Sequence, residues 1–140
     1  MKKIFIDTNV FIRFLVNDNK KMSQEAMKLF ERIEGGKIKA ETDLIVITEI
    51  VWVLSSFYKI KRQDIFEYIS LLLQIKNLII KNEEIIFEAL DLYRNKSIDF
   101  IDAFCASFAM RRKIKLLCSY DKDFDKIDGI KRVEPKELVS

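Results

Sequence analysis

Short apolar runs alternate with longer stretches of helical periodicity along the chain, and this alternation is the feature that most restricts its fold. The first run ends at Asp7, and a helical pattern follows it. Strands separated by amphipathic helices favour parallel pairing, because a parallel connection needs a crossover that a helix can supply. We therefore expect an α/β fold with a mostly parallel central sheet of about four to five strands, flanked by helices on both faces.

The expected elements follow from hydrophobic spacing and from capping residues. Gly35 and Gly36 should end the second helix, and Asp43 should cap the third. The expected strands are one ending at Asp7, then Lys37–Glu41, Leu78–Lys81, Lys115–Tyr120 and an edge strand near Val133. The expected helices are Val10–Val16, Met22–Ile33, Leu44–Tyr58, Arg62–Ile75, Glu83–Asn95 and Asp99–Arg112, with a turn at Asp121–Ile127.

Length and composition are typical of an ordered globular chain. With 140 residues, one Pro and three Gly, we expect a single domain over residues 1–140. Cys105 and Cys118 each lack a second Cys nearby, which excludes a zinc or redox motif and favours two buried, reduced thiols in the cytoplasm. The apolar run from 44 to 58 is too short to span a bilayer, so we expect no membrane segment.

The chain contains no histidine. This absence excludes catalytic triads, Cys–His pairs, His-ligated zinc and an imidazole general base. Hydrolytic chemistry would therefore depend on carboxylates and metal. The net charge of +3 does not by itself indicate a polyanionic partner, although clustered acids would leave the remaining surface more basic and compatible with nucleic acid.

Asp7 lies at the carboxyl end of the first strand and is followed by Thr8 and Asn9. In parallel α/β sheets, ligands bind at the carboxyl ends of strands, so this acid is placed for chemistry. The alternative is that Asp7 only caps the helix that follows it.

Glu49 lies on an apolar helical face, with Ile45, Trp52 and Val53 at the neighbouring positions. Burying an unpaired carboxylate costs several kcal/mol, so we expect Glu49 to be paired, protonated or bound to a cation. The structural alternative is a lysine partner.

Asp99 and Asp102 stand three residues apart at the start of one helix, so both carboxylates face the same way. Capping explains such acids equally simply. Asp102 is followed by Ala103 and Phe104, which are expected to line the core. We therefore expect Asp102 to take part directly in the site, and Asp99 to cap the helix or support the site.

Asp121 follows the strand that ends at Tyr120, and Asp123 comes two residues later. Capping is again the alternative. Carboxylates from separate strand ends and helix starts would meet on one side of a parallel sheet, where each raises the pKa of the others unless cations neutralise them. Mg²⁺ or Mn²⁺ suits such oxygen ligands, and one or two ions could activate water against a phosphodiester. This is the chemistry of a nuclease.

Four segments resemble the motifs of PIN-domain nucleases, in the same order, and the resemblance extends over nearly the whole chain. The segments are Ile6–Val10, Thr48–Leu54, Asp99–Ala103 and Ser119–Phe124. Among these nucleases the chain is most similar to VapC-type toxins, the ribonuclease components of toxin–antitoxin pairs.

The resemblance implies a metal-dependent endoribonuclease. Its carboxylates, catalytic and metal-binding, would be Asp7, Glu49, Asp102 and Asp121, with Thr8, Asn9, Asp99, Ser119 and Asp123 in supporting positions. It also implies a homodimer and a small antitoxin that inserts a segment into an apolar groove, to which Phe11, Phe14 and Leu15 would contribute unless they pack in the core. Basic runs at 59–62 and 111–113 would hold RNA phosphates or would simply be solvated helix ends.

Three functions remain open from the sequence. The first is a toxin ribonuclease, and the second is a PIN nuclease of RNA processing or DNA cleavage with the same site. The third is a binding module that keeps the fold without cutting. The complete set of acids argues against the third.

Overall fold

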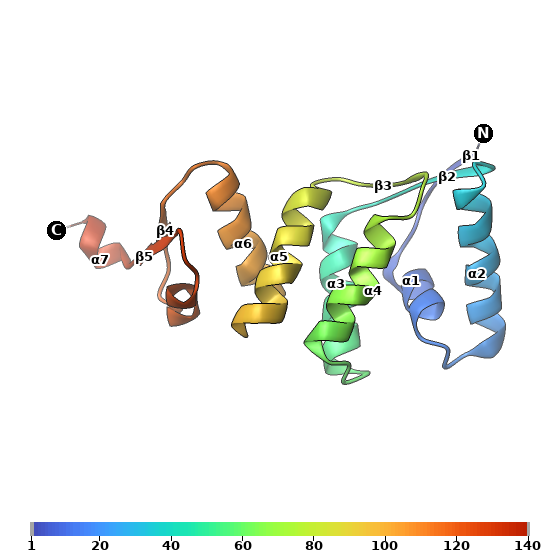
Figure 1. Ribbon diagram of the computed structural model, residues 1–140, viewed down its shortest axis with the longest axis horizontal. Coiled ribbons are helices and arrows are strands. Elements are labelled where there is room, and N and C mark those ends of the chain that lie inside the picture. Colours follow the sequence, from blue (N-terminus) through green and yellow to red (C-terminus); the bar gives the residue numbers. More distant parts are fainter. Residues whose placement is uncertain (1, 140) are drawn as a thin grey trace. The chain divides into compact units, whose positions relative to one another are not determined.

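The computed structural model describes residues 2–139 and divides into two compact units, Met1–Glu83 and Glu84–Ser140. Figure 1 shows the elements in chain order. The first unit contains β1 (Lys2–Phe5), α1 (Thr8–Leu15), α2 (Lys20–Glu34), β2 (Ile38–Thr42), α3 (Leu44–Ser56), α4 (Arg62–Leu73) and β3 (Leu78–Ile80). The second contains α5 (Glu83–Lys96), α6 (Phe100–Arg111), β4 (Leu116–Cys118), the 3-10 helix η1 (Lys122–Lys126), β5 (Lys131–Val133) and α7 (Pro135–Leu138).

The sheet of the first unit has the strand order β1-β2-β3, and both pairs are parallel. Its register pairs Phe5 with Glu41 and Ala40 with Leu78. Beyond β1, the Ile6 amide donates to the Glu41 carbonyl (3.0 Å), so pairing continues up to the residue before Asp7. The Thr42 hydroxyl, which is 1% exposed, donates to the Ile6 carbonyl at 2.9 Å. These bonds hold the carboxyl end of β1 directly in front of Asp7.

Helices α1 to α4 build the core of the first unit around apolar side chains. Helix α1 packs against α2 and α3, α3 packs against α4, and α2 packs against β2. The Phe11 ring is fully buried and lies 5.5 Å from the Phe30 ring, between centroids. Helix α3 buries five apolar residues, including Ile47 and Leu54, and therefore serves as the central helix of this unit.

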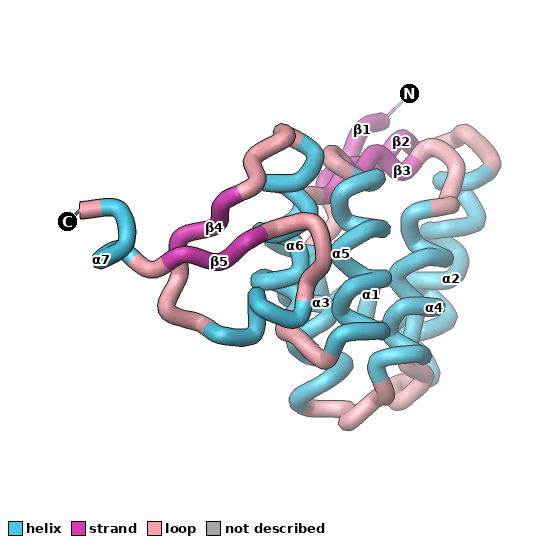
Figure 2. Tube along the Cα trace, turned by 60° about the vertical axis from the view of Figure 1, so that its left-hand side comes forward, coloured by secondary structure: helices cyan, strands magenta, loops and turns pink. Residues whose placement is uncertain are grey.

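The second unit combines two helices with a small parallel sheet. The buried side chains of α5 include Ala89, Leu90 and Tyr93, and the Tyr93 ring meets that of Phe100 edge-on at 6.5 Å. Strands β4 and β5 pair in parallel, as Figure 2 shows. The flanking backbone bonds Lys131 N to Lys115 O (2.8 Å) and Ser119 N to Val133 O (2.9 Å) extend this pairing.

The α/β class and the parallel pairing are confirmed, and every expected strand and helix occurs. Instead of one central sheet of four to five strands, the described residues form a three-stranded sheet of β1, β2 and β3 and a separate two-stranded sheet of β4 and β5. Gly35 follows α2 and Asp43 caps α3 through its side chain, as predicted. Helix α2 begins before Met22, because the Asn19 side chain accepts the Met22 amide as a cap (3.1 Å). The expectation that both thiols are buried is wrong, because Cys105 and Cys118 are exposed. The single domain over 1–140 stays a prediction.

None of the helices in residues 2–139 is both long and apolar enough to cross a membrane.

Replacing Thr42 by Val should lower the free energy of unfolding by about 1 kcal/mol, because the Ile6 carbonyl loses its buried donor. Urea denaturation measures this change. Thr48→Val is the matched control, since the Thr48 hydroxyl also donates to a carbonyl at 2.9 Å, that of Leu44 within its own helix, where the bond contributes little. Equal stability of the two variants would contradict the role assigned to Thr42.

Candidate functional site

Three carboxylates of the second unit converge. Asp102 lies in the first turn of α6, Asp121 follows β4, and Asp123 lies in η1. Each offers an oxygen within 4.8 Å of the oxygens of the other two. Asp102 and Asp123 are half-buried, and Asp121 is exposed. We call these three residues the acidic cluster, and its geometry suits a single cation between them.

Local hydrogen bonds shape the segment that carries Asp121 and Asp123. The Asp121 amide donates to the Ser119 hydroxyl oxygen (3.0 Å), and the Asp123 amide donates to Oδ1 of Asp121 (2.9 Å). Asp121 therefore caps η1, as the structural alternative predicted, through one of its two carboxylate oxygens. The Lys126 ammonium lies 3.1 Å from Oδ1 of Asp123 and supplies some positive charge beside the cluster.

Burial is the main cause that raises the pKa of Asp102 above its ordinary value. The nearby charges of Asp121, Asp99 and Asp123 act in the same direction, as does a hydrogen bond with Asp121. Both effects disfavour the ionised carboxylate. A cation in the cluster would reverse this preference.

Asp99 occupies the N-cap position of α6, but its side chain makes no capping hydrogen bond. It is exposed, and its carbonyl accepts the Ala103 amide at 2.9 Å, as any N-cap residue does. Capping by the Asp99 carboxylate is therefore not observed. The negative charge of Asp99 instead contributes to the raised pKa of Asp102.

Asp7 and Asn9, in the first unit, are exposed at the start of α1, and Thr8 between them is buried. Asp7 is the N-cap residue of α1, yet its side chain makes no capping hydrogen bond. The alternative that the Asp7 carboxylate only caps the following helix is therefore not supported by a hydrogen bond.

Glu49 corrects one expectation. It is exposed rather than buried, and its neighbours Ile45 and Trp52 are 77% and 65% exposed. The opposite side of α3, with Ile47 and Ile50, enters the core instead. The contact recorded for Glu49 is a short hydrogen bond from the Thr8 hydroxyl to Oε1, not a lysine. This bond joins the first and second sequence motifs within one unit.

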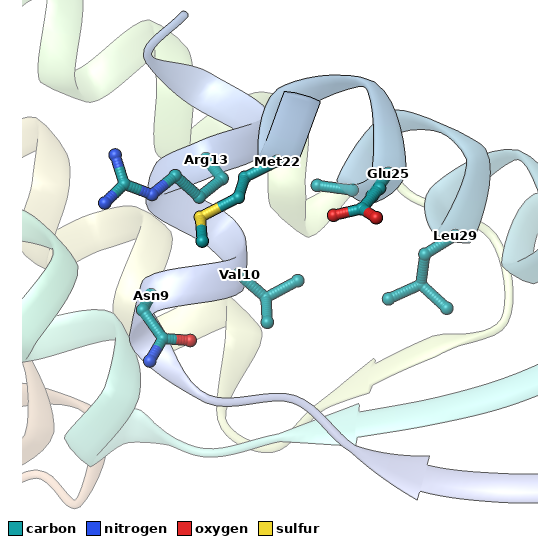
Figure 3. Close-up of a pocket in the computed structure, with 7 residues that line it drawn as sticks. Asn9, Val10, Arg13, Met22, Glu25 and Leu29 are labelled. Atoms are coloured by element: carbon teal, nitrogen blue, oxygen red, sulfur yellow. The ribbon is translucent and has the colours of Figure 1, made fainter. Parts of the chain in front are cut away.

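A groove of about 460 Å³ extends from Asn9 between α1 and α2 (Figure 3). Its lining is mainly apolar and consists of Asn9, Val10, Arg13, Met22, Glu25, Ala26 and Leu29. The residues expected there behave differently: Phe11 is fully buried, and the Phe14 ring packs on Phe30 at 4.4 Å. The missed signal is the spacing of Met22, Ala26 and Leu29, which widens the apolar face of α2 beyond the residues that it buries in the core.

The basic run at 111–113 is partly engaged in structural contacts. Arg111 pairs with Glu84 (2.7 Å) and Glu88 (2.5 Å), and the Arg112 guanidinium lies 5.5 Å from the centre of the Phe108 ring. These contacts favour the structural interpretation of Arg111.

Asp102→Asn should stabilise the metal-free protein at pH 7.5 by roughly 0.5 kcal/mol, the scale of partly exposed charge pairs. The raised pKa makes the folded state bind more protons than the unfolded state, so stability falls as pH rises from the ordinary carboxyl pKa through the raised value. The gain should shrink towards about pH 4. Thermal unfolding in a chelator measures it, with the exposed Asp64→Asn as control. A less stable Asp102→Asn protein at pH 7.5 would contradict the repulsion.

Comparison with known proteins identifies a family and two ribonucleases that this chain resembles. Residues 4–130 match the PIN domain family. A VapC ribonuclease of Aquifex aeolicus is 30% identical over 132 residues, which cover 94% of this chain and 96% of that protein. Ribonuclease VapC2 of Methanocaldococcus jannaschii is 28% identical over 144 residues, with coverage of 94% and 93%.

Among solved structures, the VapC20 toxin of Mycobacterium tuberculosis, described as cleaving the sarcin-ricin loop, is 15% identical with a TM-score of 0.41. That alignment covers 91% of this chain and 96% of the toxin. The family resemblance inferred from the sequence is confirmed by the match over residues 4–130 and by the Aquifex relative. The chain belongs to the PIN domain family.

Proposed function

We propose that this chain is a VapC-like toxin endoribonuclease that cleaves RNA with a divalent ion held by carboxylates. The observation that carries the proposal is the acidic cluster, whose three carboxylates approach within 4.8 Å in a chain of the PIN domain family. Two VapC ribonucleases that align over nearly the whole chain support ribonuclease activity.

The donor set of the cluster fits Mg²⁺ or Mn²⁺. Its ligands are carboxylate oxygens, which hard divalent ions prefer. The raised pKa of Asp102 further supports a cation, because the group is poorly stabilised as an anion without one. Asp102 and Asp121 would hold the ion, and Asp123 would support them or share in binding.

The remaining roles are proposed from the match to the family motifs. In the first unit, Asp7 and Glu49 are assigned as catalytic and metal-binding carboxylates. The supporting residues are Thr8, Asn9, Asp99 and Ser119. Two of these assignments have a physical basis within their own unit: Thr8 orients Glu49, and the Ser119 hydroxyl accepts the Asp121 amide.

A bound divalent ion would supply positive charge that steadies the phosphate and lowers the pKa of water. The carboxylates of the chain would set the position of the ion and receive the proton of the attacking water. Oε1 of Glu49 accepts the Thr8 hydroxyl, and the carboxylate keeps further lone pairs for an ion or a proton. Because the chain contains no histidine, the proposal assigns the role of general base to a carboxylate.

We assign the groove between α1 and α2 to an antitoxin. Its apolar floor suits a hydrophobic segment, and Glu25 can pair with a basic residue of that segment. Arg13 also lines the groove and already pairs with Asp18 at 2.8 Å. The groove begins at Asn9, so a segment bound there would lie close to the Asp7 end of α1. The homodimer belongs to the same proposal and rests on family resemblance.

Asp7→Asn and Asp102→Asn should each reduce RNA cleavage at least about 100-fold, because metal ligands contribute more than the residues that orient them. The assay incubates the proteins with total RNA and Mn²⁺ and maps the cleaved ends by sequencing. Asp64→Asn, at an exposed position in the first turn of α4, is the charge-matched control and should cut normally.

Full activity of either catalytic variant would overturn its assignment. Cleavage of DNA but not RNA by the wild type would instead favour a PIN nuclease of another role.

Met22→Glu should free the enzyme from inhibition by a co-expressed candidate antitoxin, because a charge would enter the apolar groove. Growth arrest and the dissociation constant of the complex measure the effect. Met27→Glu, on an exposed part of α2 that does not line the groove, is the control and should remain inhibited. Equal inhibition of both variants would place the antitoxin elsewhere.

A further inference from the structure

Arg132, on β5, connects three segments of the second unit through one guanidinium group. Its Nη1 donates to the Ser119 carbonyl (3.0 Å) and to Oε2 of Glu134 (2.9 Å). Its Nε and Nη2 donate to the two carboxylate oxygens of Asp125, at 3.0 and 3.4 Å. The side chain is only 12% exposed, so water screens these contacts less than it screens a surface pair.

These contacts lie on either side of the residues that present the cluster. Ser119 precedes Asp121 by two positions, and Asp125 follows Asp123 by two positions. A single side chain therefore fixes both ends of the segment 119–125. The internal bonds from the Asp121 amide to Ser119 and from the Asp123 amide to Asp121 complete the arrangement.

We propose that Arg132 is a positioning residue for metal binding: it holds segment 119–125 so that Asp121 and Asp123 stay within reach of Asp102. This inference rests on the proposed divalent site and adds a residue outside the four motifs. Arg132 bonds to carboxylates beside the cluster and to none within it. It acts through the backbone of the segment.

We call these contacts of Arg132 with segment 119–125 the clamp. The need for it follows from the electrostatics of the acidic cluster. Oxygens of the three carboxylates lie within 4.8 Å of one another, so the ionised groups repel one another while no cation lies between them. A segment free to move would relieve this repulsion by carrying its two acids outward. Ion binding would then have to order the segment, and the lost conformational entropy would weaken the affinity for the ion. A segment that Arg132 already holds in place avoids this loss on binding.

The geometry is specific to arginine. Its planar group presents fixed donors, which here reach a carbonyl and two carboxylates at once. A lysine at this position keeps the charge but has a single nitrogen on a flexible stem, so it can hold one end of the segment at a time. Arg132→Lys should therefore be impaired, though less than Arg132→Met.

The test compares Arg132→Met and Arg132→Lys with Arg111→Met. Arg111 is a matched control, because it also bridges two carboxylates, those of Glu84 and Glu88, and belongs to the same unit. Calorimetric titration with Mn²⁺ alone measures ion affinity. Amide hydrogen exchange of the metal-free proteins measures the order of the segment at Asp121 and Asp123.

Arg132→Met should weaken Mn²⁺ binding about 10-fold to 100-fold, as expected for residues that orient metal ligands. Exchange at the Asp121 and Asp123 amides should accelerate, while amides in α5 and α6 keep their protection. The Mn²⁺ affinity and the amide exchange rates of Arg132→Lys should lie between those of Arg132→Met and the wild type. Arg111→Met should match the wild type in both measurements.

Two results would overturn the inference while leaving the divalent site intact: unchanged Mn²⁺ affinity in Arg132→Met, or an equal loss in Arg111→Met. If amides throughout the second unit of Arg132→Met lose protection, that variant is unfolded and Arg132→Lys is used as the test variant instead. Unchanged amide exchange at Asp121 and Asp123 in folded Arg132→Lys would then also overturn the inference. Absence of Mn²⁺ binding in the wild type would overturn the proposed site itself, and with it the role of Arg132 in metal binding.

Discussion

Every strand pair within residues 2–139 is parallel, and parallel strands cannot be joined by a tight turn. Successive paired strands must therefore be joined by a crossover, and the residue at which the crossover begins lies at the carboxyl edge of the sheet. Asp7, Asp43 and Asp121 all occupy such positions. Asp43 uses its carboxylate to cap α3 at 2.6 Å, whereas Asp7 makes no capping bond. Strand ends thus supply candidate acids. The carboxylates of Asp43 and Asp121 also cap the helix that follows, whereas that of Asp7 makes no capping bond.

The acidic cluster has an electrostatic cost that the local structure only partly offsets. The Asp123 amide stabilises the Asp121 carboxylate, and Lys126 stabilises that of Asp123. Burial and neighbouring charges leave Asp102 with a raised pKa. In a protein that binds a cation at this point, the cost is recovered on binding, because the ion favours the ionised forms. The Arg132 contacts fit this scheme, since ligands that repel one another stay together only when their backbone is held.

Sequence reasoning succeeded where the physical cause is local. The Asp43 cap, the helix end at Gly35 and the short strand at Val133 depend on neighbouring residues, and each occurs as expected. It failed for the environment of Glu49. Helix α3 is apolar on most of its surface, so periodicity could not tell which face enters the core. Packing places Ile47 and Ile50 inside and leaves Glu49 exposed.

By itself, the sequence determined the α/β class, the order of the elements, the family and the acids available to a site. These follow from residue spacing, from strand-end positions and from the absence of histidine. Only the tertiary structure joined Thr8 to Glu49, opened the groove beside Met22 and brought Arg132 to Ser119. Such contacts join side chains from different elements. They depend on how helices and strands pack in three dimensions, which local propensity and spacing do not specify.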